Sequence, residues 1–146
     1  MPEIDPKIKQ FYGEETLEIL MGPTQLEIYT LESKASKDVA TAKLNKYTIK
    51  HKSETGLSVQ GLNAILFDVG IYDFEHAKRG MFFPEIGIKA TKVEKSLVLL
   101  FDFFRNEILL EYAGKEKKTN FDLGRDRLIQ LFQDNLGDKF TIQQTK

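Results

Sequence analysis

One block of this chain, Glu85–Tyr112, restricts the possible folds more than any other. It reads EIGIKATKVEKSLVLLFDFFRNEILLEY, three runs of strand-forming residues separated by polar breaks at Thr91–Lys95 and Arg105-Asn106. The second break is only two residues long, which is the length of a tight hairpin loop. The block therefore predicts three consecutive antiparallel strands.

Periodicity and end signals predict the elements before this block. A helix begins near Pro6 and ends at Gly22-Pro23, although Gly13 weakens the pattern. Two alternating strands then follow, with a polar loop between them. The strands are Gln25–Leu31 and Lys46–Lys52, and the loop is Glu32–Leu44.

Two helices are predicted between the second strand and the block. Ser58 can cap the first, which carries apolar residues at helical spacing and ends at Gly70. Asp73 can cap a shorter one, Phe74–Arg79, with Gly80 just beyond its end.

After the block, Gly114–Lys118 indicates a charged turn. Asp122 can cap a last helix, which Gly137 terminates. Residues 138–146 are expected either to fray or to add a short strand, and residues 1–5 to fray.

This order of elements predicts one α+β domain over residues 1–146. Its sheet is expected to be mostly antiparallel, with about five strands and with helices packed on one face. A doubly wound fold would require strands and helices to alternate strictly, and Glu85–Tyr112 breaks that alternation. The length of 146 residues also fits a single domain that folds without a metal or disulfide.

Composition excludes several kinds of chemistry. The absence of cysteine excludes disulfides, thiolate metal sites and cysteine nucleophiles. The net charge of −1 provides no global field that would attract nucleic acid or an acidic membrane. Because phenylalanine carries no polar group, most of the 11 Phe rings should lie in the core.

The N-terminal residues predict a cytoplasmic protein. They are acidic and polar, without the basic and apolar regions of a secretory signal, although a signal removed earlier would leave the same sequence. The longest apolar run, Leu97–Phe101, has the length of a strand, so no membrane association is expected.

His76 is the first candidate for chemistry, because Asp73, Glu75 and Asp68 lie close to it in sequence. Residues three apart on a helix could form an acid–base pair or hold a metal. A catalytic metal site typically needs about three protein ligands, and no second motif supplies them. A helix cap followed by a surface histidine is therefore the favoured interpretation, with no metal and no cofactor.

Asp102 interrupts an otherwise apolar strand. In a pleated strand, Leu99, Phe101 and Phe103 point to one side, which we expect to be core. Asp102 then points to the other side and is expected to touch water, since a buried charge would need a partner. Phe104 would be partly exposed on that side, at the hairpin turn.

The segment Arg79–Pro84 is the densest unusual cluster. Its consecutive Met, Phe and Phe cannot all face inward from an extended chain, so some must meet solvent, another chain or a covering loop. A corner that plugs the core is the alternative explanation. Together with Phe104 and Arg105 at the predicted hairpin turn, this cluster predicts a partner-binding surface. Its residues are Arg79, Met81, Phe82, Phe83, Phe104 and Arg105.

Residues 34–52 hold six lysines and could contact phosphates. No aromatic platform or known nucleic-acid motif accompanies them, which makes nucleic acid a weak prediction. Phosphate-loop, dinucleotide-binding, serine-hydrolase and zinc-protease motifs are likewise absent from the sequence.

A set of spaced residues runs through the second half, namely Tyr72, Arg79, Phe82, Pro84 and Gly124-Arg125. Over residues 70–136 this spacing resembles a group of small uncharacterised bacterial proteins. Those have a tyrosine-containing helix, a Lys-Cys-x-Phe-x-Pro segment, a strand with a Cys-x-x-Cys-like end, and a final helix. Gly80, Phe101 and Phe104 stand near the cysteine positions. The resemblance covers under half of the chain, carries over no thiol or metal role, and implies no known activity.

The sequence therefore predicts a non-catalytic module that binds another protein through the aromatic and basic surface. The alternative is a small-ligand domain or hydrolase that uses acidic residues near His76, and a further alternative is nucleic-acid contact through residues 34–52. A homo-oligomer is left open.

Overall fold

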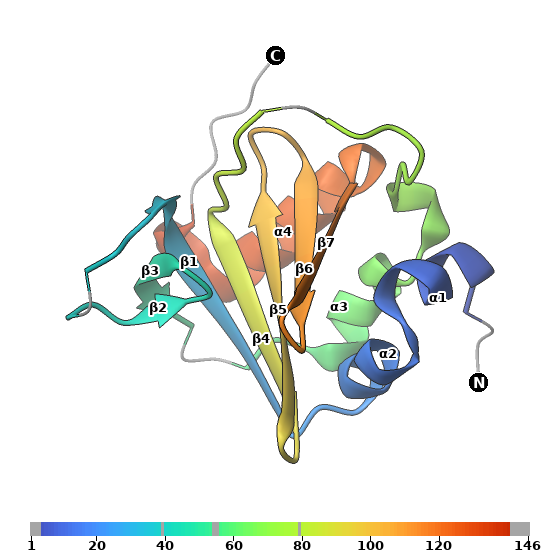
Figure 1. Ribbon diagram of the computed structural model, residues 1–146, viewed down its shortest axis with the longest axis horizontal. Coiled ribbons are helices and arrows are strands. Elements are labelled where there is room, and N and C mark those ends of the chain that lie inside the picture. Colours follow the sequence, from blue (N-terminus) through green and yellow to red (C-terminus); the bar gives the residue numbers. More distant parts are fainter. Residues whose placement is uncertain (1–3, 39, 54–55, 79, 141–146) are drawn as a thin grey trace.

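The computed structural model describes residues 4–38, 40–53, 56–78 and 80–140, and its strands form one antiparallel sheet (Figure 1). The order across the sheet is β2-β3-β1-β4-β5-β6-β7. The α+β class is confirmed, but the sheet has seven strands rather than about five. The strands are β1 Gln25–Ala35, β2 Lys43–Leu44, β3 Tyr47–Lys52, β4 Ile86–Lys92, β5 Lys95–Asp102, β6 Glu107–Tyr112 and β7 Lys115–Asn120.

The helices pack against one face of this sheet (Figure 1). The α-helices are α1 Pro6–Tyr12, α2 Glu14–Met21, α3 Val59–Leu66 and α4 Arg125–Leu136. Short 3-10 helices occur at η1 Val69–Ile71, η2 Asp122–Gly124 and η3 Gly137–Lys139. No helix in the described residues is long and apolar enough to cross a membrane.

Local signals explain most of the helix ends. Asp5 caps α1, and Ser58 caps α3 as predicted, its hydroxyl accepting from the Gly61 N–H at 3.0 Å. The first predicted helix is split at Gly13, whose φ of 84° suits glycine and breaks the helix. The last helix begins after η2 rather than at Asp122, and Gly137 ends it as predicted, with a φ of 58°.

The predicted helix Phe74–Arg79 is wrong in its described residues, 74–78, none of which is helical. The backbone of Asp73 instead pairs with Asn120, its N–H donating to the Asn120 carbonyl at 3.0 Å. The Asp73 side chain accepts the Glu75 N–H at 3.0 Å, which forms a turn. A tertiary contact with the edge of the sheet has thus replaced the expected local structure.

Two polar segments predicted as turn and loop contain strand residues. A two-residue turn, Ala113-Gly114, connects β6 to β7, where a longer turn at Gly114–Lys118 was expected. The sequence of β7 is KEKKTN, and its first four residues are exposed. Such an edge strand is held by its backbone pairing with β6, so hydrophobic periodicity could not detect it. The predicted loop Glu32–Leu44 likewise contains the end of β1 and all of β2.

The main core lies between the sheet and the helices. Leu99, Phe101 and Phe103 are buried there, which confirms the predicted core side of β5. The rings of Phe101 and Phe103 meet Phe121, Phe132 and Phe140 in one aromatic cluster. Phe140 belongs to the tail that was expected either to fray or to add a short strand; it is 4% exposed, and its ring lies 5.5 Å from the Phe103 ring. Residues 1–3 and 141–146 lie outside the described chain.

The opposite face of the sheet also carries a core. Its members include Tyr29, Leu31, Leu44, Tyr47, Leu100 and Leu109. Leu44 on β2 lies so close to Gly87 on β4 that an added Cβ would meet it at 2.4 Å. The amide of Asn45 reaches Glu116 on β7 at 3.4 Å. The β2–β3 hairpin therefore covers this second face.

Candidate interaction surface

Residues 73–78 and 80–85, between η1 and β4, pass over the turn that joins β5 to β6 (Figure 1). We call residues 73–78 and 80–85 the strap and residues 103–106 the β5–β6 turn. That turn is four residues long, where a two-residue loop was predicted. The strap and the turn carry the residues that were predicted to bind a partner, except that Arg79 lies outside the described residues.

Asp102 joins the strap to the turn. Its carboxylate accepts the N–H groups of Phe104 at 2.9 Å, Arg105 at 3.0 Å and Phe83 at 3.0 Å. Asp102 is 0% exposed, so the expectation that it touches water is wrong. The error arises because the second face of the sheet is covered as well. Within the described residues, three backbone donors and no ion pair stabilise this buried acid.

A second buried acid holds the side chain of Arg105. Glu107 stands opposite Asp102 in the ladder, is 3% exposed, and accepts from Arg105 Nε at 3.1 Å. Lys118 Nζ lies 3.9 Å from the same carboxylate. The guanidinium also packs against Gly80, whose φ is +119° and whose added Cβ would meet Arg105 Nη1 at 2.5 Å. Arg105 is therefore directed into the molecule, with 23% of its side chain exposed.

Glu85 supports the turn from the helix side of the sheet. Its carboxylate accepts the Phe103 N–H at 3.0 Å. Burial raises the pKa of the Glu85 carboxyl to about 6, against the opposing effect of that backbone hydrogen bond. Arg125 donates to the Phe103 carbonyl and to Asn106 Oδ1. The turn is thus fixed from both faces of the sheet.

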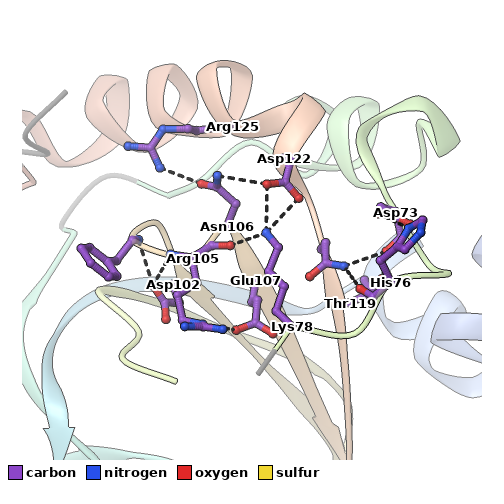
Figure 2. Close-up of polar contacts among 12 residues, drawn as sticks. Asp73, His76, Lys78, Asp102, Arg105, Asn106, Glu107, Thr119, Asp122 and Arg125 are labelled. Carbon is purple, nitrogen blue, oxygen red and sulfur yellow. Dashed lines mark hydrogen bonds and ion pairs between the residues drawn. The ribbon is translucent and has the colours of Figure 1, made fainter. Parts of the chain in front are cut away.

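Further polar contacts fasten the start of the strap (Figure 2). Lys78 Nζ donates to both carboxylate oxygens of Asp122 at 2.9 Å and to the Arg105 carbonyl. Asn120 donates its side-chain amide to the carbonyls of Asp73 and His76. These contacts connect the strap, the turn, β7 and η2 into one polar network.

Two large apolar side chains of the strap and the turn face solvent. Phe104 is 81% exposed and Met81 is 70% exposed. Phe104 was expected to be partly exposed on the Asp102 side of the strand, but β5 ends at Asp102 and Phe104 lies in the turn. Phe82 and Phe83 are only half-buried, and Lys118 Nζ lies 5.6 Å from the centre of the Phe82 ring. Since Asp102 bonds both segments, Met81 and Phe104 extend from adjoining, fixed stretches of backbone.

His76 and Asp73 line a separate groove of about 1100 Å³ between α1, η1 and β7. His76 Nδ1 lies 2.9 Å from Asp73 Oδ2, but the His76 side chain is 80% exposed. The Glu75 N–H lowers the pKa of the Asp73 carboxyl, and His76 adds to the effect. Glu75 also lines the groove.

Asp68, the fourth residue of the predicted acidic cluster, lies elsewhere. It pairs with Arg127 at 2.6 Å and accepts the Gly70 N–H, and the arginine lowers the pKa of its carboxyl. Within the described residues, no three acidic or histidine side chains are grouped so that they could hold a metal ion.

The lysines of residues 34–52 lie on β1, β2 and β3 and on the segments that connect them. Several already have contacts within the chain: Lys52 pairs with Glu27 at 2.6 Å, and Lys46 lies over the Tyr47 ring at 5.9 Å. Contact with phosphates stays a prediction.

Comparison with models of protein families, with curated proteins and with solved structures finds no match to this chain. The resemblance of residues 70–136 to a bacterial group therefore stays a prediction.

The sequence interpretation missed two acids that shape this surface, Glu85 and Glu107. Glu85 stands at the start of a strand, after Pro84, and Glu107 follows the turn as an ordinary polar residue. Glu107 bonds Arg105, which packs against Gly80 of the strap, and Glu85 is the last residue of the strap. No local sequence pattern indicates these contacts.

Proposed function

We propose that the protein is a non-catalytic module that binds a partner protein through Met81 and Phe104. The observation that supports this most is the combination of two highly exposed apolar side chains with a backbone fixed by hydrogen bonds to the buried Asp102 carboxylate. A large exposed apolar side chain is ordinary by itself, but two on adjoining segments form a candidate contact.

The rigidity of the turn matters for affinity. Ordering a flexible loop on binding opposes association, and a turn held by Asp102, Glu85 and Arg125 is already ordered. Burying one such side chain fully contributes about 1.5–3 kcal/mol. Two side chains are too few for a stable complex, so the half-buried Phe82 and Phe83 would lie at the edge of the interface.

Site-specific crosslinking tests this proposal. A photo-crosslinking residue in place of Phe104 should capture a discrete partner from cells of the source organism, and Met81→Ser should reduce that product. The same residue in place of Val93 is the control, because Val93 is 78% exposed on the β4–β5 turn at the other end of the sheet. The proposal fails if Phe104 and Val93 positions capture the same proteins or none.

A small-ligand or hydrolytic role at the groove is the second candidate. It is favoured by one observation, the hydrogen-bonded Asp73–His76 pair on the wall of a groove of about 1100 Å³. A screen of hydrolase substrates and metabolites against the wild type and His76→Gln tests it. Activity or binding that His76→Gln leaves unchanged would reject this role for the pair.

A further inference from the structure

A second cavity, of about 450 Å³, shares only Glu85 with the strap. It is lined by part of β1, by Lys50 of β3, by Glu85, and by Lys139 and Phe140 at the end of α4 and η3. The contributing residues of β1 are Thr30, Leu31, Glu32, Ser33 and Lys34. We call this space the bulge cavity.

Irregular strand pairing forms the bulge cavity. Thr30 stands opposite His51 and Leu31 opposite Ile49, so the ladder skips Lys50. The next pair is Ala35 with Tyr47, which leaves Glu32–Lys34 on β1 facing a single residue of β3. Bulges redirect side chains and are common beside functional sites. Both bulged segments line the cavity.

Thr30 gives this cavity an unused hydrogen-bonding group. The residue is 4% exposed, and its Oγ1 has no hydrogen-bond partner. Buried hydroxyl groups in native proteins are nearly always bonded, so an exception calls for a ligand or an ordered water. Thr30 is therefore an independent sign that something occupies the cavity.

Three lysines give the bulge cavity positive charge. Lys34, Lys50 and Lys139 come from three different elements and are all exposed at the cavity. None of them has an ion pair or side-chain hydrogen bond within the described chain. The acids that line the same space are Glu32, which is exposed, and Glu85, whose carboxylate is already bonded to the Phe103 N–H.

We infer that the bulge cavity binds a small multivalent anion, such as a phosphate ester or a dicarboxylate. The Thr30 hydroxyl donates to an anion oxygen, and the three ammonium groups neutralise its charge. This inference does not rest on the proposed protein-binding function, because the cavity shares only Glu85 with the strap and the turn, and neither Met81 nor Phe104 lines it.

Glu85 makes the affinity depend on pH. Its carboxyl lies between the cavity, with Glu32, Lys34, Lys50 and Lys139, and the turn, where Asp102 opposes and Arg125 favours its charged form. Protonation of Glu85 removes a negative charge from the cavity, so anion binding should strengthen as the pH falls toward the pKa of Glu85.

Sulfate is a suitable probe, because it keeps both negative charges between about pH 5 and about pH 8. In an NMR titration of the whole chain, we expect saturable shifts at Thr30, Lys50 and Phe140, with chloride at equal ionic strength giving none. Thr30→Val should weaken sulfate binding by about tenfold or more, since it removes a hydrogen bond to a charged group. Because this variant also removes an unsatisfied hydroxyl, it should fold as well as the wild type.

Charge-matched lysine variants complete the test. Lys50→Gln should weaken sulfate binding about two- to fivefold. Lys95→Gln, the same change on the exposed β4–β5 hairpin, should leave it unchanged. Between about pH 8 and about pH 5, wild-type affinity should rise about threefold, and Glu85→Gln should reduce that dependence.

Equal sulfate affinity in the wild type and a folded Thr30→Val variant would overturn the inference. So would shifts confined to other surfaces. Phenyl phosphate and succinate then distinguish the two ligand sources: whichever binds more tightly than sulfate, with the same loss in Thr30→Val, identifies its class.

Discussion

The β5–β6 turn and the bulge cavity differ in whether their buried polar side chains are hydrogen-bonded. At the turn, the buried carboxylate of Asp102 accepts three backbone N–H groups. At the cavity, the equally buried hydroxyl of Thr30 has no partner. A satisfied group fixes the backbone around it, whereas an unsatisfied one weakens the free protein and can be satisfied by a ligand. The first region is therefore suited to presenting Met81 and Phe104, and the second to receiving a molecule.

The largest expected effect on stability comes from removing the Asp102 carboxylate at the β5–β6 turn. Asp102→Ala leaves three backbone N–H groups without their acceptor and should lower the free energy of unfolding by about 3–5 kcal/mol. Urea denaturation measures this change. Asp122→Ala is the matched control, because its side chain is 46% exposed in the same network, and its loss should stay under about 1 kcal/mol. Equal losses would show that Asp102 does not organise the turn.

The contact between strap and turn can be tested at Gly80. Alanine there must adopt a positive φ and displace the Arg105 guanidinium, so Gly80→Ala should cost about 1–3 kcal/mol in urea denaturation. Gly56→Ala is the control, since an added Cβ meets nothing within 4 Å and the backbone needs no positive φ. That substitution should change stability by less than about 0.5 kcal/mol. A harmless Gly80→Ala would mean that the strap does not rest on Arg105.

Glu85 belongs to both regions, and its titration should make the free energy of unfolding depend on pH. Its folded pKa of about 6 is above its ordinary value of 4.5, so folding favours the neutral acid. The resulting stability is present below pH 4.5 and is lost as the pH rises through about 6. Allowing for partial exposure, the loss should be about 1–2 kcal/mol. The urea midpoint measured against pH, for wild type minus Glu85→Gln, isolates this slope from other carboxyls. A flat difference would contradict the assignment.

The smallest expected effect on stability comes from removing the Thr30 hydroxyl at the bulge cavity. Thr30→Val should leave the free energy of unfolding unchanged or raise it by up to about 1 kcal/mol, because the lost hydroxyl had no partner. Thr119→Val provides the contrast, since the Thr119 hydroxyl donates to the Asp73 carbonyl at 3.1 Å. That buried threonine should lose about 1 kcal/mol in the same measurement. If Thr30→Val proves the more damaging change, the two regions do not differ as described.

Much of the scaffold follows from sequence patterns that act over a few residues. Alternation along β5 places Leu99, Phe101 and Phe103 in the core, and Gly137 ends α4, as predicted. The candidate surface was only partly predictable. The exposure of Phe104 follows from its position beside a turn, whereas the inward direction of Arg105 depends on Glu107 and Gly80.

The sequence by itself determined the α+β class, the central strands and the apolar side of β5, because side-chain alternation and helix end signals are local. Only the tertiary structure decided that Asp102 is buried, that the polar run KEKKTN is a strand, and that Thr30 lacks a partner. Each of these depends on segments far apart in the chain. The β2–β3 hairpin covers the second face, the backbone of β6 pairs with β7, and two bulges bring β1 and β3 around one cavity. Burial of a polar group is set by what packs over it, and no pattern of neighbouring residues encodes that.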